Sequence, residues 1–381
     1  MPSTSPAPRV LHISTDSVGV IVITTDAAVA DWLNSYLGSW WTVRELPTPD
    51  GVSGAPVLRC DLDPAAYRFA HEQVSCAPHH VVEFARRPIL VAGRSHPVHA
   101  VDAGAQVAYH TMDGQQVSLV AADSLELCLA AARIARELVR VQLEADGWAI
   151  LHASAVVRDD AVVRDDIALL TVGPKGAGKT TTALLLACAG WRLLANDRVF
   201  INPATLALLP WPAAAALGIG LLHAHGLLAG VRQRLTTGHR LHPTVNPTVV
   251  AAISAGRVDA LADEHGKELK PQFFPHQLVD WLGLRLARSA TAGQLLFPRI
   301  DPTGQPGLEP AARSLTSTDF FDPAADDRYP DFLRLARSST QQRQRMWVHV
   351  RQRVAALPHR GVRLNHDTAR SRQLLATLAA Q

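Results

Sequence analysis

The chain has 381 residues, of which 48% are hydrophobic and 19% charged, and this length leaves room for two domains. A formal net charge of +3 is too small to indicate nucleic-acid binding, and no apolar run reaches the roughly 18 residues of a membrane span. With four scattered cysteines and an N-terminus unlike a signal peptide, the chain is expected to be cytoplasmic and to bind neither nucleic acid nor a membrane.

The first domain is predicted to be a mixed α/β extension over residues 1–145, with a role in substrate recognition. Residues 18–25, VGVIVITT, form a β-branched run typical of a strand, and residues 27–40 have apolar residues at helical spacing. Short apolar runs between about residues 44 and 120 alternate with turn residues, which indicates a meander of strands. Ser124 can then cap a long helix.

The second domain is predicted over residues 146–381 and begins with two strands, at 148–157 and 167–173. Between them lies a short tandem repeat, VVRDDAVVRDD, at residues 156–166. A six-residue unit that occurs twice is far too short for a solenoid, so we interpret it as the polar tip of a hairpin.

A glycine-rich loop follows the second of these strands and precedes a helix predicted at 179–189. The loop, GPKGAGKT, matches the pattern G-x-x-x-x-G-K-S/T. Its glycines let backbone N–H groups and a helix N-terminus face an anion, while the lysine reaches the β- and γ-phosphates and the threonine hydroxyl can ligate Mg²⁺. The pattern predicts ATP bound with Mg²⁺. The residues expected to bind it are Gly173, Pro174, Lys175, Gly176, Ala177, Gly178, Lys179, Thr180 and Thr181.

A carboxylate follows soon after this loop. The next predicted strand, RLLAN at 192–196, ends in Asn196 and Asp197, and Asp197 lies 17 residues after Thr180. The strand is expected to lie next to the loop strand, so that Asp197 faces the ligand edge of the sheet. There it can hold Mg²⁺ together with Thr180, take a proton from an attacking hydroxyl, or merely end the strand.

The segment LHASAVV, followed by LLTVGPKGAGKTTTALLLACAGWRLLANDRVFI, resembles the HPr kinase/phosphorylase family and its relatives over roughly residues 148–202. These relatives include kinases that phosphorylate serine in peptide natural products such as lasso peptides. The resemblance implies an α/β fold with a P-loop HPr kinase/PEP carboxykinase-like core. The layout of residues 1–145 is similar to the N-terminal extension of the peptide-modifying relatives.

The resemblance also implies roles for individual residues. The family has an Asp-Asp pair whose second member is the base, and this role falls on Asp197, with Asn196 in place of the first Asp. His152 matches a histidine near the phosphates. The family's glutamate before its glycine-rich segment is absent here, where Ala213 to Ala216 stand, and this weakens the case for HPr as substrate and for phosphorolysis.

Further cations are candidates for contact with the γ-phosphate or the acceptor. Only four of the 37 basic residues are lysines, so Lys267 and Lys270 stand out, and Arg299 lies in a predicted strand, LLFPRI. The C-terminal part is rich in arginine, with ten arginines and one acid between residues 334 and 372. Such a stretch can attract an acidic partner or form a solvated helical face.

The sequence therefore predicts a kinase that moves the γ-phosphate of ATP to a hydroxyl group. The acceptor is a serine or threonine of a peptide or protein, or a small-molecule alcohol in a biosynthetic pathway. Two alternatives remain: a nucleotide-binding regulatory protein with little turnover, and an ATP-dependent enzyme that activates a carboxylate. The sequence leaves open whether the chain forms a homo-oligomer.

Overall fold

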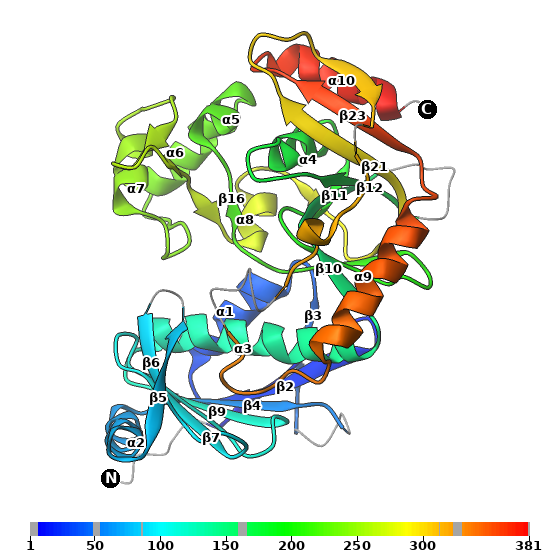
Figure 1. Cartoon of the computed structure of the whole chain (residues 1–381). Coiled ribbons are helices and arrows are strands. Elements are labelled where there is room, and N and C mark those ends of the chain that lie inside the picture. Colours follow the sequence, from blue (N-terminus) through cyan, green and yellow to red (C-terminus); the bar gives the residue numbers. More distant parts are fainter. Residues whose placement is uncertain are drawn as a thin grey trace. The chain divides into compact units, whose positions relative to one another are not determined.

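A computed structural model describes residues 7–48, 54–84, 87–158, 166–311, 313–322 and 330–379 (Figure 1). The chain divides into two units. Unit 1 comprises Met1–Trp148 and Phe321–Gln344, and unit 2 comprises Ala149–Phe320 and Arg345–Gln381. Both units combine helices with large sheets of mixed strand direction, which confirms the α/β class.

Unit 1 contains, among its described residues, a nine-stranded sheet in the order β3-β1-β2-β4-β9-β8-β7-β6-β5. The pairs β2–β4 and β4–β9 are parallel and the others antiparallel. The predicted strand at 18–25 is therefore confirmed, and the predicted meander is confirmed over β5–β9, whereas β4 pairs in parallel with β2 and β9. The strands are β1 (Arg9–Thr15), β2 (Val18–Thr24), β3 (Thr42–Leu46), β4 (Val57–Leu62), β5 (His79–Phe84), β6 (Arg87–Ala92), β7 (Val98–Asp102), β8 (Val107–Thr111) and β9 (Gln116–Ala121).

The described helices of unit 1 are α1 (Ala27–Leu37), α2 (Pro64–Cys76) and α3 (Ser124–Ala145). The helix α2 lies where only strands were predicted. Asp63 starts it by accepting hydrogen bonds from the N–H groups of Ala65 and Ala66, and Pro64 occupies the first turn, where its missing N–H costs nothing. The long helix α3 is confirmed, but its capping side chain belongs to Asp123 rather than to Ser124.

Unit 2 contains a ten-stranded sheet among its described residues. Eight strands follow the order β10-β14-β15-β21-β12-β11-β13-β20, while β23 pairs with both β21 and β22. Two small two-stranded sheets join β16 to β19 and β17 to β18. The strands are β10 (Ala149–Leu151), β11 (Ala153–Val157), β12 (Ile167–Val172), β13 (Arg192–Ala195), β14 (Val199–Ile201), β15 (Ala207–Pro210), β16 (Ala215–Ala216), β17 (Leu261–Ala262), β18 (Glu268–Leu269), β19 (Gln272–Phe273), β20 (Arg285–Leu286), β21 (Ala290–Ile300), β22 (Gly307–Pro310) and β23 (His359–Leu364).

The remaining described helices differ in their relation to this sheet: one packs against three of its strands, and a group of three lies apart from it (Figure 1). They are α4 (Lys179–Cys188), α5 (Ile219–Ala224), α6 (Leu228–Thr236), α7 (Pro247–Ser254), α8 (Pro275–Asp280), the 3-10 helix η2 (Ser317–Asp319), α9 (Thr340–Val354) and α10 (Thr368–Ala379). No helix within the described ranges combines the length and the apolar character needed to cross a bilayer.

The arginine-rich stretch contains α9, β23 and the start of α10 rather than one continuous helix. In α9, Val350 and Val354 are buried in the core of unit 2, and the ring of Trp347 stacks on Phe320 with centroids 5.4 Å apart. Arg345 and Arg353 of the same helix are exposed. This division between an apolar and a basic face fits a solvated helical face.

The strands β11 and β12 pair antiparallel, as a hairpin around the tandem repeat requires. Residues 159–165, which include most of that repeat, lie outside the described residues. The predicted single strand over 148–157 is two strands, since β10 ends at Leu151 and β11 begins at Ala153. The interruption falls on His152.

Candidate active site

The glycine-rich loop connects β12 to α4, so its strand and helix are where the sequence predicted them. The strand β12 is internal to the sheet, with β11 antiparallel on one side and β21 parallel on the other. The loop therefore emerges at the carboxyl edge of central strands, where α/β sheets place their ligands.

Three glycines shape the loop for different reasons. Gly176 and Gly178 have φ of +84° and +103°, which other L-residues rarely adopt. A Cβ at Gly178 would lie 2.8 Å from Cδ1 of Ile300, and one at Gly173 would lie 3.0 Å from Cβ of Ala177. Nothing lies within 4 Å of a Cβ placed at Gly176, so the crest of the loop is open on that side.

Lys179 folds back onto the loop. Its ammonium donates hydrogen bonds to the carbonyl oxygens of Gly173, at 2.6 Å, and Pro174, at 3.3 Å. The pKa of Lys179 is lowered, mainly because the ammonium is partly buried. The negative charges of Asp197 and Asp319 oppose this shift, and the positive charge of Arg313 adds to it. These three charged side chains therefore lie within electrostatic reach of the ammonium.

Threonines fix the beginning of α4. The buried Thr182 donates a hydrogen bond from its hydroxyl to the carbonyl oxygen of Gly178 at 2.9 Å. The Thr171 hydroxyl lies 3.2 Å from the carbonyl oxygen of Ser154 and 3.5 Å from that of Lys179, which ties the helix start to β11 and β12. Thr180 and Thr181 are half-buried in the first turn. Of these, Thr180 stands at the motif position whose hydroxyl can ligate a metal ion.

Asp197 does not lie on a strand adjacent to the loop strand, as the sequence had led us to expect. The strand β11 separates β13 from β12 and is antiparallel to both. As a result β12 and β13 run in the same direction and end at the same edge of the sheet. Asp197 thus lies at the same edge of the sheet as the glycine-rich loop, but two strands away from β12 rather than on the strand next to it.

The register of the strands places Asp197 more closely. Leu151 of β10 pairs with Val199 of β14, and Ala155 of β11 pairs with Ala195 of β13. Both pairings keep the same register. The four strands therefore form one antiparallel two-stranded ribbon, in which β10 continues into β11 and β13 continues into β14, with an interruption in the middle. In that register Ala153 stands opposite Asp197, and Ala153 also pairs with Val172, the last residue before the loop.

Side-chain and backbone contacts hold this interruption in place. The Ser154 hydroxyl donates to the carbonyl oxygen of Asn196 at 2.5 Å. The N–H of His152 donates to the carbonyl oxygen of Asp319 at 2.8 Å, and Leu151 forms a β-bridge with Phe320. The structure therefore gathers the loop, the Asn196–Asp197 turn and the backbone of His152 at one edge of the sheet.

The Asp197 carboxylate is open to solvent, with 64% of its side chain exposed, and the Nε of Arg198 lies 3.8 Å from it. The guanidinium of Arg198 also lies over the ring of Trp211, 5.5 Å from its centroid. An exposed carboxylate at this edge of the sheet can accept a proton or coordinate a cation, because its oxygens face solvent.

Arg313 and Asp319 are residues of this region that sequence patterns did not indicate. Two hydrogen bonds of 2.7 and 2.8 Å join the guanidinium to the buried carboxylate, which also accepts the N–H of Thr316 at 2.8 Å. Burial alone would raise the pKa of Asp319, but the bonds from Arg313 and Thr316 bring it below its usual value. No motif marks this pair, because it forms through a loop between β22 and η2.

Two of the three other predicted cations, Lys270 and Arg299, are paired with carboxylates. Lys267 and Lys270 flank β18 in the small β17–β18 sheet, and the ammonium of Lys270 lies 2.9 Å from a carboxylate oxygen of Glu268. Arg299 lies near the end of β21, beside the loop strand, but its guanidinium binds Glu309 at 2.9 Å. That hydrogen bond is the main reason why the pKa of Arg299 is raised. In the described part of the chain we find no hydrogen bond or ion pair from these three residues to the loop.

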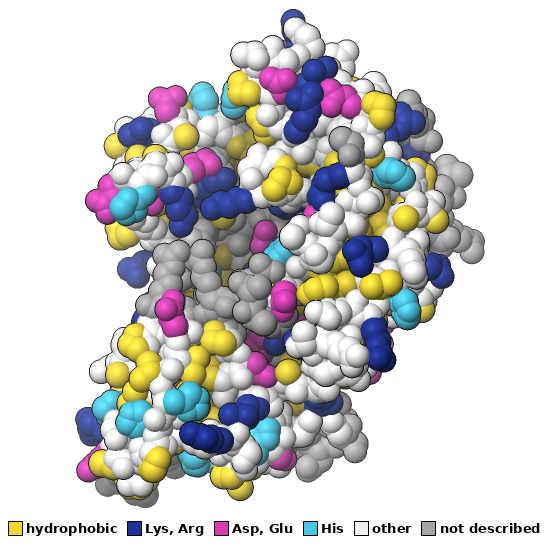
Figure 2. All heavy atoms as spheres, viewed as in Figure 1, with side chains coloured by type: hydrophobic (Ala, Val, Ile, Leu, Met, Phe, Trp, Pro, Cys, Tyr) yellow, Lys and Arg dark blue, Asp and Glu magenta, His cyan; other side chains and the backbone are white. Residues whose placement is uncertain are grey.

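Charges are mixed over the visible surface. On the face shown in Figure 2, basic and acidic side chains are interspersed, and they lie side by side near the β22–β23 end at the top of the view. The ion pairs that join Arg299 and Arg363 to Glu309 belong to this end.

A Mg²⁺ site at the loop would have few protein ligands. Within the described ranges, no group of three or more His, Cys, Asp or Glu side chains is arranged to hold a metal ion. Mg²⁺ in nucleotide sites is held by one or two protein oxygens together with phosphate oxygens and water. The Thr180 hydroxyl and the exposed Asp197 carboxylate are oxygen donors of this kind, so the residues present fit the ion.

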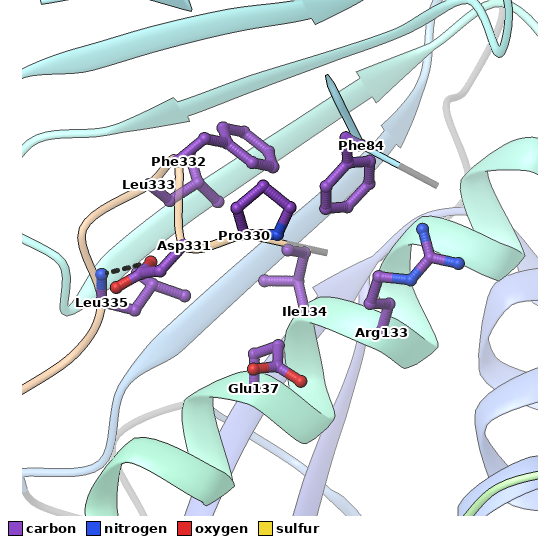
Figure 3. A pocket seen from close by; sticks show the side chains of 9 residues that line it. All are labelled: Phe84, Arg133, Ile134, Glu137, Pro330, Asp331, Phe332, Leu333 and Leu335. Carbon is purple, nitrogen blue, oxygen red and sulfur yellow. Dashed lines mark hydrogen bonds between the residues drawn. The ribbon is translucent and has the colours of Figure 1, made fainter. Parts of the chain in front are cut away.

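A pocket in unit 1 is too small to bind a substrate. It lies between α3, the end of β5 and residues 330–335, and it has room for about one water molecule, roughly 20 Å³ (Figure 3). Its lining residues are Phe84, Arg133, Ile134, Glu137, Pro330, Asp331, Phe332, Leu333 and Leu335.

Comparison with known proteins adds no assignment to this geometry. No protein-family model matches the chain, and no curated protein matches its sequence.

Proposed function

We propose that the chain is an ATP- and Mg²⁺-dependent kinase related to the HPr kinase/phosphorylase family. It moves the γ-phosphate to a hydroxyl of a peptide, a protein or a small-molecule alcohol. The observation that carries the proposal is the strand–glycine loop–helix of β12 and α4 with Asp197 at the same sheet edge, close enough for its charge to act on Lys179.

The spacing across the sheet suits this chemistry. Asp197 and Val172 stand in one row, separated by the single strand β11, which corresponds to about 10 Å between their backbones. In the proposed complex, the γ-phosphate and the acceptor hydroxyl lie at the edge of the sheet, where β12 ends in the loop and Asp197 follows β13.

The proposed reaction begins when the loop N–H groups and the N-terminus of α4 bind the phosphates, and Lys179 exchanges the carbonyl oxygens of Gly173 and Pro174 for phosphate oxygens. Asp197 accepts the proton of the acceptor hydroxyl as its oxygen bonds to the γ-phosphorus. The bond from that phosphorus to the β–γ bridging oxygen breaks, and ADP leaves. Mg²⁺, held by Thr180 and Asp197, would supply positive charge to the phosphates.

Label transfer from γ-labelled ATP tests the proposal. Purified protein with Mg²⁺ is mixed with peptide and metabolite fractions, and Asp197→Asn and Lys179→Met are run in parallel. We expect an acid-stable labelled product from the wild type alone. Asp197→Asn should retain ATP binding but transfer about 10²- to 10⁴-fold more slowly, because it lacks the base. Equal transfer by wild type and Asp197→Asn would refute the assignment of the base.

One observation favours a second function. The position before Asp197 carries Asn196, which brings no negative charge and cannot accept a proton. A nucleotide-binding regulatory protein with little turnover needs neither property. In the same experiment this function would appear as tight ATP binding without label transfer. A labelled product that hydroxylamine destroys would instead indicate an enzyme that activates a carboxylate.

A further inference from the structure

Phosphoryl transfer requires cations around the transferred group in addition to the loop lysine. The candidates from the sequence do not meet this need in the structure. Lys270 pairs with Glu268, and Arg299 pairs with Glu309. Lys267 flanks β18 in the small β17–β18 sheet, which is separate from the sheet that contains the loop strand. A cation suited to the γ-phosphate must lie beside the loop, keep part of its donor set accessible, and be held in one orientation.

Arg313 lies beside the loop. Its guanidinium carbon is 4.9 Å from the ring centroid of Phe297, on the strand β21 that runs parallel to the loop strand β12. The next residue, Pro298, has its carbonyl oxygen 3.8 Å from the position of a Cβ at Gly173, the first residue of the loop. Arg313 therefore rests on the strand end that flanks the loop.

Arg313 is also held in one orientation. The two hydrogen bonds from its guanidinium to Asp319 are bidentate, and the Asp319 side chain is only 5% exposed. The Asp319 backbone is anchored in turn, because its carbonyl oxygen accepts the N–H of His152 at the interruption of the ribbon. Such a pair fixes a planar guanidinium more firmly than a flexible lysine could be fixed.

The pairing with Asp319 leaves other N–H groups of Arg313 able to bind a ligand. A guanidinium has five N–H donors, and the bidentate pair with Asp319 uses two of them. Nη1 also makes a longer hydrogen bond, of 3.4 Å, to the carbonyl oxygen of Ser314. The side chain is 31% exposed, so its outer edge can meet a ligand. Its positive charge also acts on the Lys179 ammonium. An anion placed between two such cations relieves their repulsion.

We propose that Arg313, oriented by Asp319, binds the γ-phosphate of ATP and stays on the phosphoryl group as it is transferred. This inference rests on the proposed kinase function. It assigns to Arg313 the cation role that sequence patterns had offered to Lys267, Lys270 and Arg299. ADP lacks the γ-phosphate, so the contact distinguishes ATP from ADP.

The ratio of ATP to ADP affinity tests the inference, measured by calorimetric titration with Mg²⁺. We expect Arg313→Gln to weaken ATP binding about tenfold or more and ADP binding less than about twofold. Arg299→Gln, an arginine of the same region paired with Glu309, is the matched control and should leave both affinities unchanged. Because Arg313→Gln leaves a buried carboxylate unpaired, the double variant Arg313→Gln/Asp319→Asn, which keeps a neutral hydrogen-bonded pair, is measured as well.

Equal weakening of ATP and ADP in both variants, or no weakening in either, would overturn the inference and leave the kinase proposal standing. The kinase proposal itself fails under a different result. This is the case if the wild type binds neither nucleotide, or if Lys179→Met binds ATP as tightly as the wild type does.

Discussion

Ser154 shows how a single buried hydroxyl can position the proposed base. Its side chain is fully buried in β11 and donates to the carbonyl oxygen of Asn196, the residue before Asp197. Ser154→Ala leaves that acceptor without its donor, so we expect the free energy of unfolding to fall by about 1–3 kcal/mol and label transfer to fall more than ATP affinity. Urea denaturation measures the free energy of unfolding, and the γ-label assay measures the transfer. Ser118→Ala, in β9 of unit 1, is the control. Unchanged transfer would show that the hydroxyl does not position Asp197.

Asp319 should make stability depend on acid pH. Its pKa in the folded protein lies below the value of about 3.9 for an unfolded chain. A carboxyl with a depressed folded pKa contributes its full stability above the unfolded pKa, and loses it as the pH falls through the folded pKa. The melting temperature of the wild type should therefore exceed that of Asp319→Asn at pH 7, and the difference should shrink below about pH 4. A difference that stays constant from pH 7 to pH 3 would contradict this role.

Within the loop element, two glycines should respond differently to the same substitution. A Cβ at either Gly176 or Gly178 strains the left-handed backbone by about 1–2 kcal/mol. At Gly178 the Cβ also meets Ile300 at 2.8 Å, whereas at Gly176 it meets nothing within 4 Å. Gly178→Ala should therefore lower the free energy of unfolding by about 1–3 kcal/mol more than Gly176→Ala. Chemical denaturation of both variants decides this, and equal losses would show that Ile300 moves aside without cost.

The helix α3 carries a buried ion cluster that should not tolerate the loss of one member. Arg140 is 3% exposed and binds Glu137 at 2.6 Å and Glu144 at 2.9 Å along the helix. Arg140→Leu leaves both carboxylates buried without their cation, so we expect a loss of about 3–5 kcal/mol. The triple variant Arg140→Leu/Glu137→Gln/Glu144→Gln should recover part of it, as measured by denaturation. A triple variant less stable than the single one would contradict the account.

At the scale of the molecule, the chain leaves unit 1 after Trp148 and returns to it at Phe321. The ring of Phe332 packs edge-on against Phe84 and Tyr109, with centroids 5.0 and 5.1 Å apart (Figure 3 shows Phe84 and Phe332). This returning segment completes the core of unit 1, so unit 1 is not one continuous stretch of sequence.

Phe332→Ala should therefore destabilise unit 1 in particular, by about 3–5 kcal/mol. We expect calorimetric unfolding to show an earlier transition for unit 1. Saturating ATP should still raise the transition of unit 2, the unit proposed to bind it, because a ligand stabilises the unit that holds it. ATP affinity measured below the transition serves as the control. If Phe332→Ala shifted the ATP-stabilised transition and left the other unchanged, the assignment of this segment to unit 1 would be wrong.

Much of the architecture was predictable because it depends on local signals. Some elements can be recognised from a few consecutive residues. These are the β-branched run of β2, the glycine pattern before α4 and the apolar strand β13. The helix α2 was missed because turn-rich surroundings outweighed its start signal, Asp63 followed by Pro64. The interruption at His152 was missed because an apolar run carries no mark of a change in strand partner.

The candidate site divides in the same way. The glycine-rich loop and the position of Asp197 just after a strand follow from the order of residues, since glycine conformation and strand length are local properties. Strand pairing and long loops are set by packing between distant segments. Folding therefore decided that β11 separates Asp197 from the loop strand, and that Arg313 meets Asp319 within electrostatic reach of Lys179. Neither feature can be predicted from residue spacing along the chain, because side chains far apart in sequence become neighbours only when the sheet has formed.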